Sequence, residues 1–275
     1  MLLLKNKMVK LNNNVNIPIL GFGTYKMEDG KEAINAVSNA LEIGYRHIDT
    51  ASLYKNEKSV GEAIRNSGIK RSDIFVTTKV WNDDRGYDNT LKAFDTSLKK
   101  LNMDYIDLYL IHWPKDLNLE TWKALERLYE EKIVRAIGVS NFKEHHLEEL
   151  LKDSNIVPAI NQVEFHPQLT QPELRKYCNS KGIVLEAWSP LMRGKVFSID
   201  LLNKISKIYN KTISQIVLRW NIQLGVVTIP KSSKRERIEE NFNIFDFVLS
   251  EEHMNEINSL NEDLRVGRDP DNIDF

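Results

Sequence analysis

Short apolar runs alternate with longer amphipathic segments along almost the whole chain. In the first of these segments, residues 30–44, Ala33, Ile34, Val37 and Leu41 recur with the period of a helix and form one stripe. The same period predicts helices over residues 88–102, 198–210 and 212–225. The short runs are rich in Ile, Val and aromatic residues and predict eight strands, over residues 18–23, 46–50, 74–80, 105–113, 133–140, 158–165, 182–190 and 225–232.

Turn and capping residues mark the ends of these elements. The stretch 9–18 places two short alternating runs around consecutive Asn residues, which tolerate positive φ and predict a leading β-hairpin. Asn89-Thr90 and the segment 170–173 have the composition of helix N-termini. Glycines are expected to end the helices that precede them at Gly44, Gly68 and Gly182.

Strands separated by helices are typical of parallel βαβ units, and eight such units predict an α/β fold that closes into a (β/α)₈ TIM barrel. Two helical segments lie between the seventh and eighth strands, so we expect extra helices between strand seven and the C-terminus. A doubly wound sheet is the alternative, but the first strand lacks the full G-x-G-x-x-G pattern of a dinucleotide-binding turn. Because the sequence contains no linker or low-complexity tract, we expect residues 1–275 to form a single domain.

Composition narrows the class of protein. The 275 residues include 38 Lys and Arg against 39 Asp and Glu, a formal charge of -1, which gives no global field for nucleic acid or anionic lipid. The single Cys178 cannot form an internal disulfide and is expected to be a small hydrophobic residue. The apolar opening, residues 1–5, is too short for an export signal, and no stretch is long enough to span a bilayer. We expect a soluble, cytoplasmic, monomeric protein.

Polar residues gather where the predicted strands end. In barrels of this kind the catalytic and binding residues lie at the C-terminal ends of the strands and in the loops that follow. Asp49 ends the second predicted strand, and Tyr54 lies in the loop after it. Lys79 ends the third strand and His112 the fourth. Lys79 lies in an apolar run and needs a carboxylate partner, for which Asp49 is available. A cation held beside Tyr54 would lower its pKa and make it a general acid, while His112 could align a substrate carbonyl.

Other candidate groups have simpler interpretations. Adjacent His145 and His146 do not share a helix face as metal ligands should, so we expect surface residues and no metal site. His166 is expected to be structural. The basic segment 231–237 begins a helix after strand eight, where the loops of such barrels commonly bind phosphate.

Long motifs in this chain resemble those of the aldo-keto reductases. They are "GYRHIDTASLYKNEKSVG" at 44–61, "TKVW" at 78–81, "LIHWP" at 110–114, "AIGVSNF" at 136–142, "NQVEFHP" at 161–167 and "IPKSSKRERIEEN" at 229–241. The resemblance runs from about residue 9 to the C-terminus. It implies a (β/α)₈ barrel, a nicotinamide cofactor bound without a Rossmann domain, and a catalytic tetrad of Asp49, Tyr54, Lys79 and His112.

The resemblance also assigns cofactor contacts. Those near the nicotinamide are Gly23, Thr24, Tyr25, Asp49, Ser140, Asn141, Gln162 and Trp188, with Ser189 and Leu191 along the pyrophosphate. Those near the adenosine and its 2′-phosphate are Lys231, Ser232, Ser233, Arg237, Glu240 and Asn241. The basic residues of the second group favour NADPH over NADH.

The expected substrate pocket is aromatic. Its walls are Tyr25, Trp81 and Trp113 beside His112, and the final segment, 265–275, is expected to fold over the barrel mouth. Because this tail is short, we expect an open pocket for small aldehydes. The whole chain also resembles bacterial glyoxal and methylglyoxal reductases, which implies the reduction of 2-oxoaldehydes. A keto-sugar reductase of the 2,5-diketogluconate type is the nearest alternative. A Schiff-base aldolase acting through Lys79 and a non-catalytic binding subunit are the others.

Overall fold

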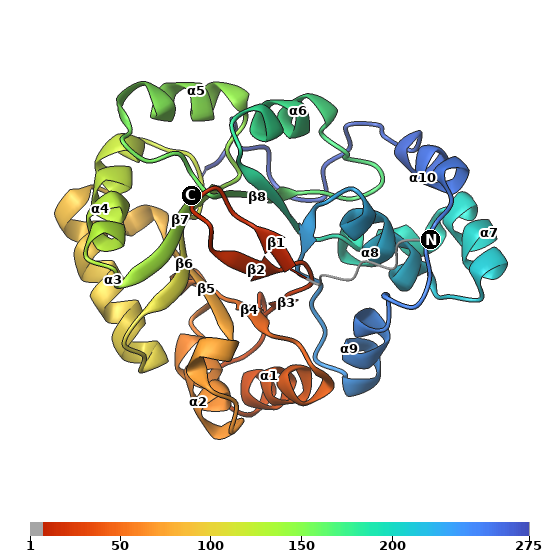
Figure 1. Ribbon diagram of the computed structural model, residues 1–275, viewed down its shortest axis with the longest axis horizontal. Helices are drawn as coiled ribbons and strands as arrows, with labels where there is room; N and C mark the ends of the chain where they lie inside the picture. The colour runs from red at the N-terminus through yellow and green to blue at the C-terminus, as the bar shows by residue number, and fades with distance from the viewer. Residues whose placement is uncertain (1–7, 275) are drawn as a thin grey trace.

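The computed structural model describes residues 8–274, which form a closed barrel of parallel strands surrounded by helices (Figure 1). Successive strands pair side by side in chain order, from β3 to β10. Leu20, just before β3, forms a parallel bridge with Thr228 of β10, and the amide of Gly21 donates to the carbonyl of Thr228 at 2.8 Å. These contacts join the first strand to the last, so the predicted (β/α)₈ barrel is confirmed.

All eight predicted strands are present, each shorter than its apolar run. They are β3 (Phe22–Gly23), β4 (His47–Asp49), β5 (Phe75–Val80), β6 (Ile106–Ile111), β7 (Val134–Ser140), β8 (Ile160–Glu164), β9 (Val184–Trp188) and β10 (Val227–Thr228). The leading hairpin consists of β1 (Met8–Lys10) and β2 (Asn16–Pro18).

Helices follow each barrel strand and pack their apolar stripes against it. The α-helices are α1 (Lys31–Ile43), α2 (Glu57–Asn66), α3 (Tyr87–Leu101), α4 (Asn118–Glu130), α5 (Glu144–Asp153), α6 (Pro172–Ser180), α7 (Asp200–Tyr209), α8 (Ile213–Gln223), α9 (Arg235–Phe242) and α10 (Glu251–Asn258). Short 3₁₀ turns are η1 (Ser52–Tyr54), η2 (Arg71–Asp73), η3 (Asn82–Asp84) and η4 (Met192–Ser198). Two α-helices follow both β9 and β10, which confirms the extra helices expected after the seventh barrel strand.

One predicted helix start is wrong. Asn89 and Thr90 lie inside α3, which begins at Tyr87 after Gly86. Gly86 adopts φ 87°, and its amide donates to Thr121 Oγ1 at 3.0 Å, so a contact with α4 sets the start of the helix. A local capping signal could not reveal that contact.

The hairpin closes the bottom of the barrel. In Figure 1 it crosses the middle of the ring of strands, at the end nearer the viewer. Its turn contains Asn14 at φ 68°, as the Asn-rich sequence predicts. Leu11 and Ile17 are buried with Phe75 and Leu108 in a small apolar cluster at this end. Because apolar side chains fill this end, the opposite end carries the open cavity.

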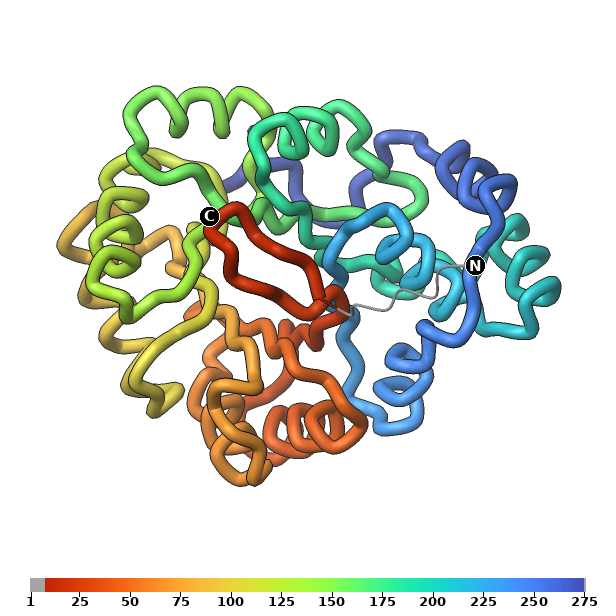
Figure 2. Tube along the Cα trace, viewed as in Figure 1, coloured from red at the N-terminus to blue at the C-terminus, as the bar shows by residue number. Residues whose placement is uncertain are grey.

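The C-terminal segment crosses that opposite end. In Figure 2 it passes behind the strands, on the side away from the hairpin. Among the described residues, no helix is both long and apolar enough to cross a bilayer. The opening residues 1–5 and the last residue lie outside the described part of the chain, so a single domain over 1–275 stays a prediction.

Candidate active site

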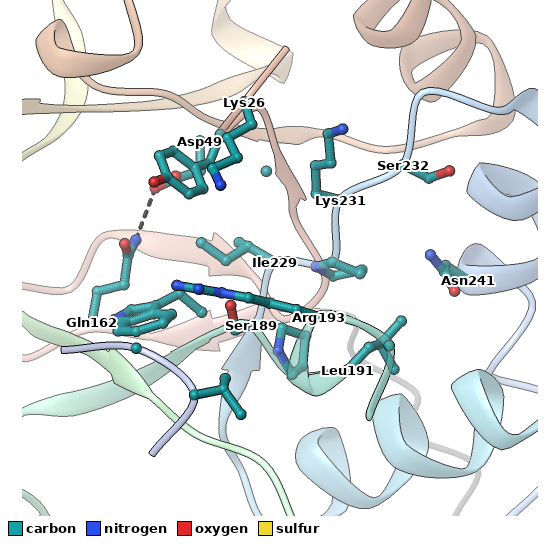
Figure 3. Close-up of a pocket in the computed structure, with 18 of the residues that line it drawn as sticks. Lys26, Asp49, Gln162, Ser189, Leu191, Arg193, Ile229, Lys231, Ser232 and Asn241 are labelled. Atoms are coloured by element: carbon teal, nitrogen blue, oxygen red, sulfur yellow. Dashed lines mark hydrogen bonds between the residues drawn. The ribbon is translucent and has the colours of Figure 1, made fainter. Parts of the chain in front are cut away.

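A cavity of about 1400 Å³ opens at the C-terminal ends of the strands. Figure 3 shows Asp49 and Gln162 at one end of it and Lys231, Ser232 and Asn241 toward the other. Of the expected contacts, those lining it are Gly23, Tyr25, Asp49, Tyr54, Trp81, His112, Trp113, Ser140, Asn141, Gln162, Trp188, Ser189, Leu191, Lys231, Ser232, Arg237, Glu240 and Asn241. Its volume exceeds the usual range for one drug-sized ligand, about 300–1,000 Å³, and suits a cofactor together with a substrate.

A buried ion pair forms the floor of the cavity. Lys79, fully buried on β5, donates from Nζ to both carboxylate oxygens of Asp49, at 2.6 and 2.8 Å, and to the carbonyl of Thr50 at 2.8 Å. Three bonds use all three ammonium protons. Burial raises the pKa of Asp49, while Lys79 and Gln162 lower it. The predicted pairing of Lys79 with Asp49 is therefore present in the structure.

The effect of the Lys79–Asp49 pair on Tyr54 differs from what the sequence predicts. Lys79 Nζ lies 5.2 Å from the centroid of the Tyr54 ring, and its protons are directed elsewhere. Burial raises the pKa of Tyr54 well above 10, and the charges of Asp49, Tyr25 and Glu186 raise it further. Tyr54 is thus a firmly protonated phenol, and the lowered pKa we expected from the sequence does not appear. A protonated phenol can still donate its proton once charge develops on a partner.

His112 lies beside Tyr54. Their ring centroids are 5.6 Å apart in a T-shaped arrangement, and the Trp81 ring lies 5.1 Å from His112 on another side. Burial lowers the pKa of His112 well below 6.5, and the charges of Lys79 and Arg85 lower it further. The imidazole is therefore neutral, with one N–H. Its Nδ1 is buried and has no hydrogen-bond partner among the residues that the structure describes.

The ends of β7 and β9 are joined by side-chain hydrogen bonds. Trp188 Nε1 donates to Asn141 Oδ1 at 2.8 Å, and Asn141 Nδ2 donates to Ser140 Oγ and to the carbonyl of His112. Asn141 and Ser189 both adopt positive φ, at 66° and 49°. Such strained backbone is concentrated at functional sites. This network holds the amide of Asn141 and the indole of Trp188 in fixed orientations at the cavity wall.

Positive charge lies at the far end of the cavity. Lys231 and Arg237 line it beside the start of α9, and Ser232 Oγ accepts from the amide of Lys234 at 3.1 Å. Arg235 points elsewhere, because its guanidinium bonds Glu42 and Asn39 of α1 at 2.6 Å. Two cations at a helix N-terminus form an anion site.

Two expected contacts do not line the cavity. The Thr24 hydroxyl is fully buried and donates to the carbonyl of Asp49 at 3.0 Å, so it braces β3 against β4. Ser233 is exposed to solvent in the loop before α9. Sequence motifs place both residues near the site, but the direction of each side chain depends on neighbours from other strands.

The model of the Aldo/keto reductase family matches residues 19–262. The chain belongs to this family. It is 57% identical to glyoxal reductase of Bacillus subtilis (strain 168) over 268 residues, which cover 97% of both chains.

Solved structures agree with that assignment. MGS-M4, an aldo-keto reductase enzyme from a Medee basin deep-sea metagenome library, has a TM-score of 0.95 and 52% identity, covering 97% of this chain and 100% of its own. A mutant of Gox0644 in complex with NADPH has a TM-score of 0.93 and 39% identity, covering 98% of both chains. Both likenesses extend over nearly the whole of this aldo/keto reductase.

The tail of this aldo/keto reductase is clasped over the cavity by a residue that sequence reasoning missed. Glu164, fully buried at the end of β8, accepts the amides of Val266 and Gly267 on Oε1, at 2.6 and 3.1 Å, and His166 Nε2 contacts the same oxygen at 3.1 Å. A side chain on Gly267 would overlap the Trp188 ring. The segment 266–268 therefore lines the cavity as expected, and His166 has a structural partner.

A second contact fixes the tail further out. Lys143 pairs with Asp269 and Asp271, and both His145 and His146 place Nε2 near Asp271 Oδ1, at 3.1 and 3.4 Å. The two histidines thus share a carboxylate neighbour at the start of α5, and the group is compact enough to consider for a metal ion. However, His146 Nδ1 accepts the amide of Lys143, so in the neutral ring the proton lies on Nε2, the atom nearer Asp271. We interpret this group as a latch for the tail.

Replacing Glu164 with Ala tests the inner clasp. The change removes the acceptor of two amides, and hydrogen bonds to charged groups contribute about 1.5–3 kcal/mol, so local exchange should accelerate about tenfold or more. Hydrogen exchange at Val266 and Gly267, followed by mass spectrometry, measures this. Glu173→Ala, an exposed acid on α6, is the control. Unchanged exchange in the Glu164 variant would show that the tail is held elsewhere.

Proposed function

We propose that this enzyme uses NADPH to reduce small aldehydes and 2-oxoaldehydes to alcohols. The observation that carries the proposal is the convergence of Tyr54, His112 and the Lys79–Asp49 pair on one end of a cavity large enough for a cofactor and a substrate. The family is one of reductases, the relative at 57% identity is named glyoxal reductase, and a neighbouring structure holds NADPH.

The cavity suits a dinucleotide phosphate at both ends. Lys231 and Arg237 would bind the 2′-phosphate, with Glu240 and Asn241 near the adenine. At the other end, Ser140, Asn141 and Gln162 would contact the carboxamide, and the Trp188 ring would stack on the nicotinamide. Asn141 has both amide protons engaged, and its carbonyl oxygen accepts from Trp188, so the second lone pair of that oxygen is the position available to a carboxamide N–H.

The geometry supports a different role for each of Tyr54, Lys79 and His112 in carbonyl reduction. NADPH, when bound, supplies the hydride that reaches the carbonyl carbon. Tyr54 donates its phenolic proton to the carbonyl oxygen, and solvent then restores that proton. The charge of Lys79 stabilises the phenolate that forms, because its ammonium is held 5.2 Å from the ring centroid by Asp49. Neutral His112 orients the carbonyl with its N–H.

The substrate end favours small molecules. Trp81 packs against His112, Tyr25 against Tyr54 and Trp113 against Trp188, and all three line the cavity. Val266 and Gly267 of the tail line it as well. These aromatic rings make the walls apolar and provide few hydrogen-bonding groups for a polyhydroxylated substrate. A keto-sugar reductase therefore remains the alternative rather than the proposal. The bonds from Lys79 to both oxygens of Asp49 also disfavour a Schiff-base aldolase, which needs a neutral amine.

Tyr54→Phe tests the proton donor. The ring and its packing stay, but the hydroxyl is lost, so the chemical step should slow by at least about a hundredfold while NADPH still binds. Single-turnover NADPH oxidation measures that step directly. Tyr87→Phe, an exposed tyrosine on α3, should keep the parent rate. More than half of the parent rate in the Tyr54 variant would rule out the proposed role.

Arg237→Ala and Lys231→Ala test the phosphate contacts. Each removes a charge-assisted hydrogen bond, so NADPH binding should weaken by about 1.5–3 kcal/mol while NADH binding barely changes. Fluorescence titration with both cofactors gives the comparison. Arg235→Ala is matched to the first variant, because Arg235 lies two residues away and pairs with α1. Equal losses for both cofactors would contradict the assignment.

A substrate panel tests selectivity. Small 2-oxoaldehydes should have the highest kcat/KM, because the adjacent carbonyl makes the reacting carbon more electrophilic. Neighbouring aldehydes should react less efficiently, since one methylene changes pocket binding by only about 1–3 kcal/mol. NADPH oxidation is followed with methylglyoxal, simple aldehydes and keto-sugars. Keto-sugars at least tenfold better than every 2-oxoaldehyde would favour the alternative function.

A further inference from the structure

Two buried carboxyl groups, those of Asp49 and Glu186, lie beneath the cavity near a single buried cation. Glu186 on β9 is fully buried, and it lies on the far side of Gln162 from Asp49. Lys79 is the cation of this cluster, and its three protons go to Asp49 and to Thr50. Within residues 8–274, Glu186 therefore has no ammonium or guanidinium bond of its own. Because an unpaired buried charge is very costly, a carboxyl in this position holds its proton.

Gln162 connects the two carboxyl groups. Its Nε2 donates to Asp49 Oδ2 at 2.8 Å and to Glu186 Oε2 at 3.0 Å, so both amide protons are engaged (Figure 3 shows the bond to Asp49). The opposite orientation would direct the amide oxygen at Oδ2 of the Asp49 carboxylate, which can only accept, and is disfavoured by repulsion. The carbonyl oxygen of Gln162 is thereby left for the cavity, which Gln162 lines.

We propose that Glu186 is a positioning residue, a neutral carboxylic acid inside the barrel that, together with Asp49, fixes the amide of Gln162 with its oxygen toward the nicotinamide carboxamide. The inference rests on the proposed function in assigning that carboxamide to Gln162 and, for the pH dependence, in assigning the proton transfer to Tyr54. Glu186 touches neither substrate nor cofactor and acts through Gln162.

The surroundings of Glu186 locate its proton. Because Oε2 accepts from Gln162, the proton belongs on Oε1, which has no hydrogen-bond partner among the described residues and lies 3.6 Å from His47 Nε2. His47 of β4 is itself neutral, since burial and then the charge of Lys79 lower its pKa to about 3. Burial, followed by the charge of Asp49, raises the pKa of Glu186 to about 8.

This arrangement predicts how the rate of reduction depends on pH. The titratable groups facing Glu186 are His47 and Asp49 on β4, Lys79 on β5 and Tyr54 of η1. When Glu186 ionises above about pH 8, its charge opposes that of Lys79 and disfavours the phenolate of Tyr54. The rate of reduction should then fall as pH rises. Below that pH the acid is neutral and the rate is maintained.

The first test compares Glu186→Leu with Glu186→Gln. Leu removes the acceptor, so NADPH binding measured by protein fluorescence should weaken about threefold to tenfold, as for one lost hydrogen bond. Gln keeps a carbonyl acceptor without ionising and should restore most of that affinity. Glu126→Gln, at a buried acid of α4 that binds the amides of Asn155 and Ile156, controls for general loss of stability. Equal affinity in the Leu variant and the parent, or no rescue by Gln, would overturn the proposal.

The second test begins with a measurement that needs neither cofactor nor substrate, so that measurement separates this proposal from the proposed function. Infrared difference spectra of the free protein should show a protonated carboxyl band that disappears with a midpoint near pH 8 and is missing from Glu186→Gln. In single turnovers the same variant should lose the fall in rate above that pH, whereas Glu126→Gln should keep it. A parent spectrum without the band, or an unchanged pH profile in Glu186→Gln, would show that Glu186 is not a neutral acid.

Discussion

The site depends on one ammonium group enclosed in the barrel. Lys79 is fully buried, and a charge in that position is tolerated only because its three protons reach Asp49 and the carbonyl of Thr50. These bonds tie β5 to β4. The carbonyl of Lys79 accepts from Ser52 Oγ at 3.0 Å, so the same residue also anchors η1, which carries Tyr54. The proposed proton donor is thus placed by the residue whose charge would stabilise its phenolate.

The two ends of the barrel have opposite chemistry because different segments cover them. At the bottom, Leu11 and Ile17 of the hairpin region fill the barrel with apolar side chains. At the top, the tail is held by hydrogen bonds from Val266 and Gly267 to Glu164 and by the outer latch at Lys143. The apolar side chains fill the space at the bottom, whereas the hydrogen-bonded tail lies over a cavity. The cavity therefore forms where the polar strand ends converge.

The sequence predicted elements well where burial alone determines them. The run 74–80 becomes β5, which is buried at every position, and such continuous apolar runs are typical of parallel strands. The stripe containing Ala33 and Val37 becomes the buried face of α1. The prediction failed at Asn89, because the start of α3 depends on a bond between Gly86 and a residue of α4. Local pattern carries no information about that partner.

The sequence alone determined which chemical groups lie at the strand ends. Its apolar runs locate the strands, and the parallel strands of a barrel bring Asp49, Lys79 and His112 to the same edge. Only the tertiary structure decided where their hydrogen bonds point. Gln162 and Asp49 are 113 residues apart, yet their bond orients an amide that also contacts Glu186. Hydrogen-bond direction and the pKa of a buried acid depend on neighbours from several strands, and those neighbours exist only once the barrel has closed.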